Sequence, residues 1–241
     1  MANKHGTSRE FELTELAKAT LCVLKLASRL LGTIMDITEL AKDDKVFFTA
    51  DTHFGHENII KFCNRPFANA AEMDSAIVDN WNRVVKHDCV VFHLGDFTLF
   101  DGGRAAQYFE SLNGRIYILG VPWHHDKRWL LSGNEDAPYR SYDGHPITIL
   151  PPEYSLEFKF SDKQTHPYSI HLSHYPMGEW DRAYHGGWHL HGHSHGNYKG
   201  DNHLTGEYCW DVGVDGKGIG CTPISFGGIL EWAYECNWGC A

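Results

Sequence analysis

The chain has 241 residues, of which 42% are hydrophobic and 22% are charged, and its formal net charge is −10. These proportions are typical of a globular protein and exclude a disordered, collagen-like or coiled-coil chain. The excess of acidic residues counts against a long nucleic acid held through its phosphates. A small phosphate ester is compatible with the charge, because a bound cation reverses the local field.

The N-terminal part predicts an amphipathic helix over residues 11–34, because its apolar residues recur every three or four positions. This helix either packs on the core or forms an arm that binds a partner or a second copy of the chain. A shorter helix is expected over residues 37–42, with Asp36 as its cap. We therefore expect a helical extension over residues 1–44 and one domain over residues 45–241.

Neither a signal peptide nor a membrane segment is expected. Glu10 and Glu12 precede any apolar run, and the most apolar stretch, residues 21–35, is interrupted by Lys25 and Arg29. The seven cysteines are scattered and form no Cys-x-x-Cys pair, which favours reduced thiols. These features predict a cytoplasmic protein.

Short apolar runs alternate with amphipathic segments in the first half of the chain. The runs 45–50, 89–94 and 115–119 predict strands, and the segments 70–86 and 103–112 predict helices. In the second half, where no long helix is evident, strands are expected over residues 146–150, 155–160, 168–173, 188–191, 208–214 and 223–231. The pattern predicts the α/β class, as a layered α-β-β-α sandwich of two mixed sheets flanked by helices.

Metal-binding side chains gather where the predicted strands end. The chain has 17 histidines, and nine of them lie between residues 166 and 203. Successive strand ends carry carboxylates and imidazoles, namely Asp51, His53, Asp96, His124, His125, His174, His193 and His195. Because sites in α/β sheets form at the carboxyl ends of strands, we expect a metal site there. Each motif alone is also a common turn, so the prediction depends on the ordered set.

The ordered set resembles the calcineurin-like metallophosphoesterases. The residues that carry the resemblance are Asp51-Thr52-His53, Gly95-Asp96, His125-Asp126, His174 and Gly192-His193-Ser194-His195. The flanking stretches 49–67, 173–180 and 211–215 resemble a small phage and bacterial branch of that family. The resemblance covers residues 45–231 and leaves out the N-terminal arm.

The resemblance implies two divalent transition-metal ions with Asp96 bridging them. The first ion would be held by Asp51, His53, Asp96 and His195, and the second by Asp96, His174 and His193. Mixed oxygen and nitrogen ligands suit Mn²⁺, Fe, Zn²⁺, Ni²⁺ or Co²⁺. A hydroxide bridging the ions would attack a phosphate ester, with the matching histidine of the family, His125, as the catalytic side chain.

One motif departs from the family pattern. The family's Gly-Asn-His-Asp stretch reads Trp123-His124-His125-Asp126 here, so an imidazole stands where an amide ligand is usual. Three outcomes are open: His124 binds the second ion, it turns away and water replaces it, or the second site is weak. The bulk of Trp123 in a glycine position also makes a different loop backbone an open outcome.

Three further side chains have two interpretations each. Asp126 either orients the His125 imidazole or caps a helix. His56 either contacts the phosphate of the substrate or only packs beside the first motif. Arg182 either pairs with a phosphate oxygen through its planar guanidinium group or forms a surface salt bridge.

These inferences predict a dinuclear metal-dependent phosphoesterase that hydrolyses a small phosphomonoester or phosphodiester. One alternative is a catalytically weakened metal-binding or scaffold protein of the same fold. Another is a nuclease that acts on short or cyclic nucleotides. Metal analysis combined with a panel of phosphate esters would discriminate between them.

Overall fold

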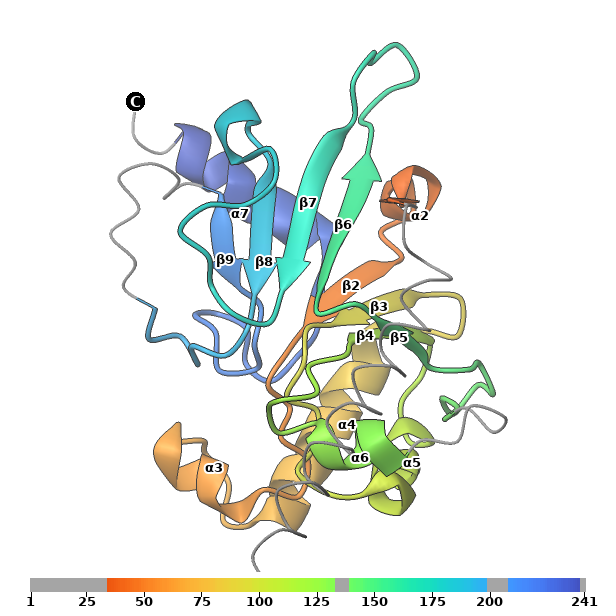
Figure 1. Cartoon of the computed structure of the whole chain (residues 1–241), viewed down its shortest axis with the longest axis vertical. Coiled ribbons are helices and arrows are strands. Elements are labelled where there is room, and N and C mark those ends of the chain that lie inside the picture. Colours follow the sequence, from red (N-terminus) through yellow and green to blue (C-terminus); the bar gives the residue numbers. More distant parts are fainter. Residues whose placement is uncertain (1–33, 133–138, 199–207, 239–241) are drawn as a thin grey trace, which may run out of the picture.

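The computed structural model describes residues 34–132, 139–198 and 208–238. The helix expected over residues 11–34, and any self-association through it, lie outside these residues. Two five-stranded sheets make up the α/β core and are flanked by helices (Figure 1). Each sheet combines parallel and antiparallel pairs, so the predicted class and the two mixed sheets are confirmed.

The first sheet has the strand order β10-β2-β3-β4-β5. Its strands are β2 (Val46–Thr49), β3 (Val90–His93), β4 (Arg115–Leu119), β5 (Thr148–Leu150) and β10 (Ile224–Ser225). Strands β2 to β5 are parallel, and β10 is antiparallel to β2. Their carboxyl ends therefore lie at one edge, as the sequence predicts.

The second sheet has the strand order β1-β6-β7-β8-β9. Its strands are β1 (Met35–Asp36), β6 (Glu153–Phe158), β7 (Tyr168–Ser173), β8 (Trp188–His191) and β9 (Cys209–Asp211). The β6–β7 pair is antiparallel and the other pairs are parallel. Strands β7 and β8 consequently deliver the segments 174–175 and 192–196 to the same end of the sheet.

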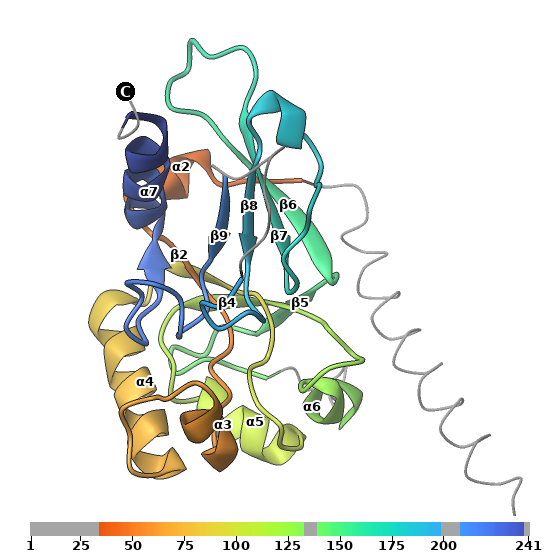
Figure 2. The ribbon, with the colours of Figure 1, turned by 90° about the vertical axis from the view of Figure 1, so that its left-hand side faces the viewer.

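Four helices cover the outer face of the first sheet (Figure 2). They are α3 (Glu57–Phe62), α4 (Ala70–Val84), α5 (Gly102–Phe109) and α6 (Lys127–Ser132). Phe47 and Val91 face these helices, whereas Phe48 and Phe92 face the core between the sheets. Burial on both faces explains why these strands are continuous apolar runs rather than alternating ones.

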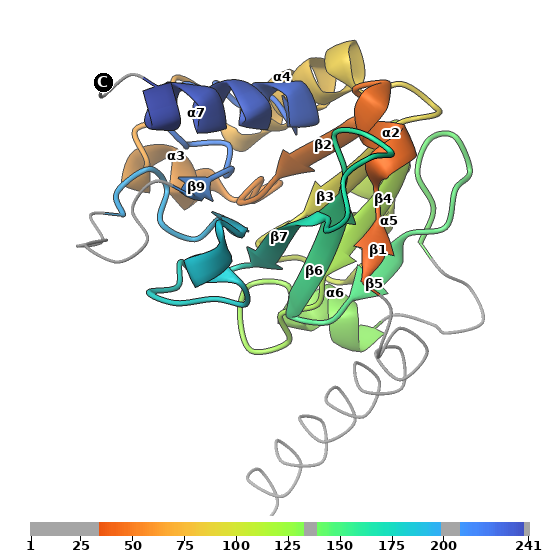
Figure 3. The ribbon, with the colours of Figure 1, turned by 90° about the horizontal axis from the view of Figure 1, so that it is seen from above.

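The C-terminal segment corrects one prediction. Residues 223–231 are expected as a strand, but only β10 is extended, and α7 (Phe226–Trp238) follows it. Phe226, Ile229 and Ala233 are three and four residues apart, the spacing of one helix face, and all three are buried in the core between the sheets. Gly227 and Gly228 are poor helix formers, but this packing makes the segment helical. The helix runs alongside the second sheet (Figure 3).

The expected domain boundary at residue 44 is also corrected. Strand β1 pairs in parallel with β6, and Ile37 beside it is fully buried. Helix α2 (Thr38–Lys42) lies in the predicted place, and Asp36 accepts a hydrogen bond from the Thr38 backbone N–H at 2.8 Å. Residues 35–42 are therefore part of the sandwich rather than of an extension.

None of the helices in these three ranges is long and apolar enough to cross a membrane. The described cysteines Cys63, Cys89, Cys209 and Cys221 are free thiols. The cytoplasmic location stays a prediction.

Candidate metal centre

Five strand ends bring the predicted ligands together. Segments after β2, β3 and β4 carry Asp51 with His53, Asp96, and His124 with His125. Segments after β7 and β8 carry His174, His193 and His195. The two sheets thus contribute to one cluster, and its ligand atoms form groups whose members lie within 4.8 Å of one another.

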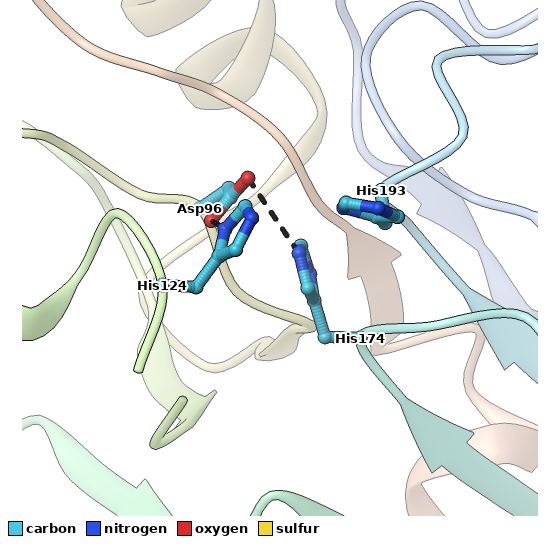
Figure 4. Close-up of side chains that lie close together, drawn as sticks. All are labelled: Asp96, His124, His174 and His193. Atoms are coloured by element: carbon cyan, nitrogen blue, oxygen red, sulfur yellow. Dashed lines mark hydrogen bonds and ion pairs between the residues drawn. The ribbon is translucent and has the colours of Figure 1, made fainter. Parts of the chain in front are cut away.

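One group consists of Asp96, His124, His174 and His193. Figure 4 shows the carboxylate of Asp96 facing the three imidazole rings, with His124 approaching from the first sheet and His174 and His193 from the second. The His124 Nδ1 lies 2.5 Å from one Asp96 oxygen. One carboxylate and three imidazoles are a ligand set that suits transition metals.

A second group consists of Asp51, His53 and His195. The Asp51 carboxylate is fully buried and accepts the backbone N–H of His193 through both oxygens, at 3.0 and 2.8 Å. The His53 and His195 rings stack with their centroids 5.3 Å apart. These three side chains are the ones predicted for the first ion together with Asp96.

Asp96 lies between the two groups. Its Oδ2 atom is 3.4 Å from the His53 Nε2 and 3.5 Å from the His174 Nε2, while its Oδ1 atom contacts His124. Burial disfavours the charged form of Asp96, but the neighbouring imidazoles of His124 and His174 outweigh it and lower its pKa below the ordinary value. An ionised carboxylate in this position is suited to bridging two cations.

The backbone of this cluster adopts a rare conformation. Nine non-glycine residues of the described segments have positive φ angles, and five of them are predicted ligands: Asp51, His53, Asp96, His193 and His195. Left-handed backbone costs a residue with a side chain about 1 kcal/mol or more. Such strain gathers at functional sites, where it fixes the direction of the side chains.

Several buried polar atoms of the cluster have no hydrogen-bond partner. They are both ring nitrogens of His53 and the Nε2 atom of His174. Unpaired buried polar atoms are rare in folded proteins and point to a ligand. Burial and the charge of Asp96 also raise the pKa of the Asp51 carboxyl well above its ordinary value. A bound cation would satisfy the rings and offset the crowded carboxylates, so the residues fit metal ions.

Trp123 and His124 occupy the loop without a left-handed backbone at either residue. Trp123 has no positive φ angle, so this tryptophan does not need the backbone freedom of glycine. Its side chain is 60% exposed, while the His124 ring points inward to Asp96 and lies 5.2 Å from the His193 ring. His124 is therefore directed into the cluster rather than to solvent.

Two further predicted side chains lie at the rim. His125 is 36% exposed, and its Nε2 atom is 3.9 Å from the Asp96 Oδ2. Burial lowers the pKa values of both His125 and His56 below the ordinary value for histidine. The His56 ring lies 6.1 Å from the His125 ring and 5.5 Å from the His53 ring. Both histidines can reach a molecule bound at the cluster.

Asp126 directly precedes helix α6, the position expected of a helix cap, and it has a further task that was not expected. Its Oδ1 atom accepts the backbone N–H groups of Phe97 and Thr98 and the indole N–H of Trp129, and no described hydrogen bond joins it to His125. It thereby ties the loop of Asp96 to helix α6. Burial raises the pKa of this carboxyl to about 7. The expectation that it orients His125 is not supported.

Of the two interpretations of Arg182, phosphate binding or a surface salt bridge, the structure shows the salt bridge. Its guanidinium group pairs with the Glu157 carboxylate of β6 at 3.1 Å. Arg182 directly precedes the short helix η1 (Ala183–His185). The chain then enters β8 at the end opposite to His193. Arg182 borders a separate cavity, lined also by His166 and His185. Nearness in sequence to the histidine motif suggested the role, but the strand between them separates the two.

The structure also adds residues that the sequence analysis gave no role. Arg65 and Asp215 form a buried ion pair beside His195, and Asp211 accepts the Ser194 hydroxyl at 2.6 Å. Both aspartates belong to the stretch 211–215, and Arg65 belongs to the stretch 49–67. The resemblance drew attention to these stretches, but spacing alone does not indicate their contacts.

The fold and the cluster together define the chain as an α/β sandwich with a candidate metal centre. No known family profile matches the sequence. The uncharacterized protein MJ1445 of Methanocaldococcus jannaschii is 36% identical over 139 residues, which are 55% of this chain and 74% of that protein. The chain belongs to the same family as that protein.

Two other proteins are similar. The Gene 66 protein of Mycobacterium phage L5 is 30% identical over 105 residues, which are 42% of this chain and 44% of that protein. The crystal structure of AQ665, a protein of unknown function from Aquifex aeolicus, has a TM-score of 0.53 and 24% identity, and the match covers 77% of this chain and 97% of that one. The latter likeness shows the fold alone.

Proposed function

We propose that this chain is a phosphoesterase that depends on two divalent transition-metal ions and hydrolyses a phosphomonoester or phosphodiester. The observation that carries the proposal is the position of Asp96, whose Oδ2 atom faces His53 of one group and His174 of the other at 3.4 and 3.5 Å. The resemblance of the ordered motifs to calcineurin-like enzymes supports it.

The ligands divide between the two sides of Asp96. Asp51, His53 and His195 would hold one ion, and His124, His174 and His193 the other. Ions held there would supply a water of lowered pKa and would neutralise charge on a phosphoryl group.

His125 is the proposed catalytic side chain. It is half-exposed at the rim, and its lowered pKa makes it a neutral imidazole near pH 7 that still carries one ring N–H. That N–H can donate to a phosphoryl oxygen or to the leaving oxygen. General acid–base catalysis of this kind contributes about 10²–10⁴-fold to the rate.

The test uses the full chain loaded with Mn²⁺ or Zn²⁺ and assayed on a phosphomonoester, a phosphodiester and a cyclic nucleotide. We expect turnover of at least one class, and His125→Ala should lower kcat by about 10²–10⁴-fold with the metal content unchanged. His166→Ala is the matched control, because His166 is exposed at the opposite end of the second sheet. Full metal content without turnover of any class would favour the weakened metal-binding protein instead.

A further inference from the structure

Arg65 occupies an unusual position below the cluster. Its side chain is 1% exposed, and helix α3 and the loop after it bring it beneath the first motif. A buried guanidinium group is costly unless its donors are paired. The groups that the Arg65 side chain contacts therefore show what its buried charge stabilises.

The side-chain contacts of Arg65 with oxygen atoms all lead to the candidate metal centre, and its Nη1 atom also contacts the Met73 sulfur at 3.2 Å. Its Nε and Nη2 atoms donate to the two oxygens of Asp215, at 2.8 and 2.7 Å, in a bidentate pair. Nη2 also donates to the Asp51 carbonyl at 2.7 Å, and Nη1 donates to the Thr52 carbonyl at 3.0 Å. The same guanidinium group thus holds the backbone of a predicted ligand, Asp51, in its left-handed conformation.

Asp215 continues the chain of contacts to a second ligand. Its Oδ2 atom lies 2.7 Å from the Nδ1 atom of His195. Because Asp215 is ionised beside Arg65, it accepts, and the His195 Nδ1 carries the proton. The lone pair of the ring is then on Nε2, which remains available as a ligand atom. Carboxylates that hold ligand histidines in this way commonly orient metal sites.

We infer that Arg65 and Asp215 are positioning residues that preassemble the first metal site by fixing the Asp51 backbone and the His195 tautomer. The inference rests on the proposed metal-dependent function. The dyad touches neither His124 nor His174 in any described contact, so its effect is confined to one side of Asp96. Arg65 and Asp215 are 150 positions apart in sequence, which explains why no local motif reveals the pair.

Two variants separate positioning from folding. Arg65→Lys keeps the buried charge but cannot make the bidentate pair and both carbonyl contacts. The double variant Arg65→Met with Asp215→Leu removes both charges together, and such apolar replacement of a buried ion pair commonly preserves the fold. Arg115→Lys is the matched control, because Arg115 is exposed on β4.

The first measurement is Mn²⁺ affinity by calorimetry in two backgrounds. His174→Ala leaves the Asp51 side intact, and His53→Ala leaves the His124 side intact. We expect Arg65→Lys and the double variant to weaken binding by about 10–100-fold in the His174→Ala background and to leave it unchanged in the His53→Ala background. Equal losses in both backgrounds, or none in either, would overturn the inference.

The second measurement needs no metal. Long-range ¹H–¹⁵N correlation spectra of the metal-free protein report which ring nitrogen of His195 is protonated. We expect the Nδ1–H form in the wild type and in Arg115→Lys, and a shift toward the Nε2–H form in the double variant. An unchanged tautomer in the double variant would overturn the role of Asp215. Failure of the wild type to bind metal would reject the proposed function, while this spectrum would still decide the role of the dyad.

Discussion

Gly192 is a point of close approach between the two sheets beside the candidate metal centre. It follows β8 of the second sheet, and a Cβ atom placed on it would lie 2.5 Å from the Ala50 Cβ and 2.7 Å from the Asp51 Oδ2. Both atoms follow β2 of the first sheet. Gly192 does not have a positive φ angle, so the backbone permits alanine and the whole cost of Gly192→Ala is steric.

The magnitude follows from this crowding. The Ala50 methyl group cannot move without moving the backbone after β2, and one extra methyl group in a filled site costs about 1–3 kcal/mol. For a domain of this size, 1 kcal/mol corresponds to about 2–4 °C in Tm, so the loss is roughly 2–12 °C. The displaced Asp51 carboxylate should also weaken metal binding on its side of Asp96.

Thermal unfolding of the metal-free and Mn²⁺-loaded protein measures both effects. Gly192→Ala should lower Tm in both states, and more in the loaded state, because weaker binding stabilises the fold less. The control is Gly178→Ala, since Gly178 is exposed and a Cβ there would have no neighbour within 4 Å. If the two alanine variants unfold alike and bind Mn²⁺ alike, the close approach of the sheets at Gly192 is not a constraint.

Three other outcomes are expected. Asp96→Ala should reduce the bound metal from about two ions per chain to below one, measured by elemental analysis, because Asp96 contacts ligands of both groups; retention of both ions would contradict this. His124→Asn should shift the affinity ratio toward Mn²⁺ over Zn²⁺ by about tenfold in competitive titrations, because an amide oxygen is a harder ligand than imidazole. Finally, burial lowers the pKa of His189 to about 3, so this ring is neutral in the fold, where it accepts the Met177 N–H. The stabilisation that the neutral His189 ring provides is complete above the unfolded pKa of about 6.5. It is lost as the pH falls toward 3, at up to about 1.4 kcal/mol of unfolding free energy per pH unit. His189→Gln should therefore flatten the dependence of unfolding free energy on pH between 5 and 6.5 in chelator, and an unchanged slope would reject that contribution.

The strands and the order of the ligands are predictable because the information is local. Strands β2 and β3 are buried on both faces, so they are short continuous apolar runs that stop abruptly at Asp51 and near Asp96. Parallel pairing then brings those ends together without further information. The same reasoning places His174 and His124 at the cluster. His174 directly follows β7, and His124 lies near the end of β4.

Other features depend on tertiary packing and are not predictable from local pattern. Helix α7 contains two successive glycines, and only the buried face of Phe226, Ile229 and Ala233 favours the helical form. Arg182 is near the histidine motif in sequence, but the length of β8 separates it from the site. The Arg65–Asp215 pair joins a loop after α3 to a loop after β9, and no periodicity relates the two.

The rare backbone conformations and the division of ligands between the sheets have a common consequence. Asp51 and Asp96 come from the first sheet, His193 and His195 come from the second, and all four residues are left-handed. The fold holds this strained backbone through buried contacts, such as the two hydrogen bonds from the His193 N–H to the Asp51 carboxylate. Those contacts cross between the sheets, so packing of the sandwich and geometry of the cluster depend on each other. A cation bound by ligands from both sheets would offset the crowding of the carboxylates and stabilise the interface between the sheets in the same step.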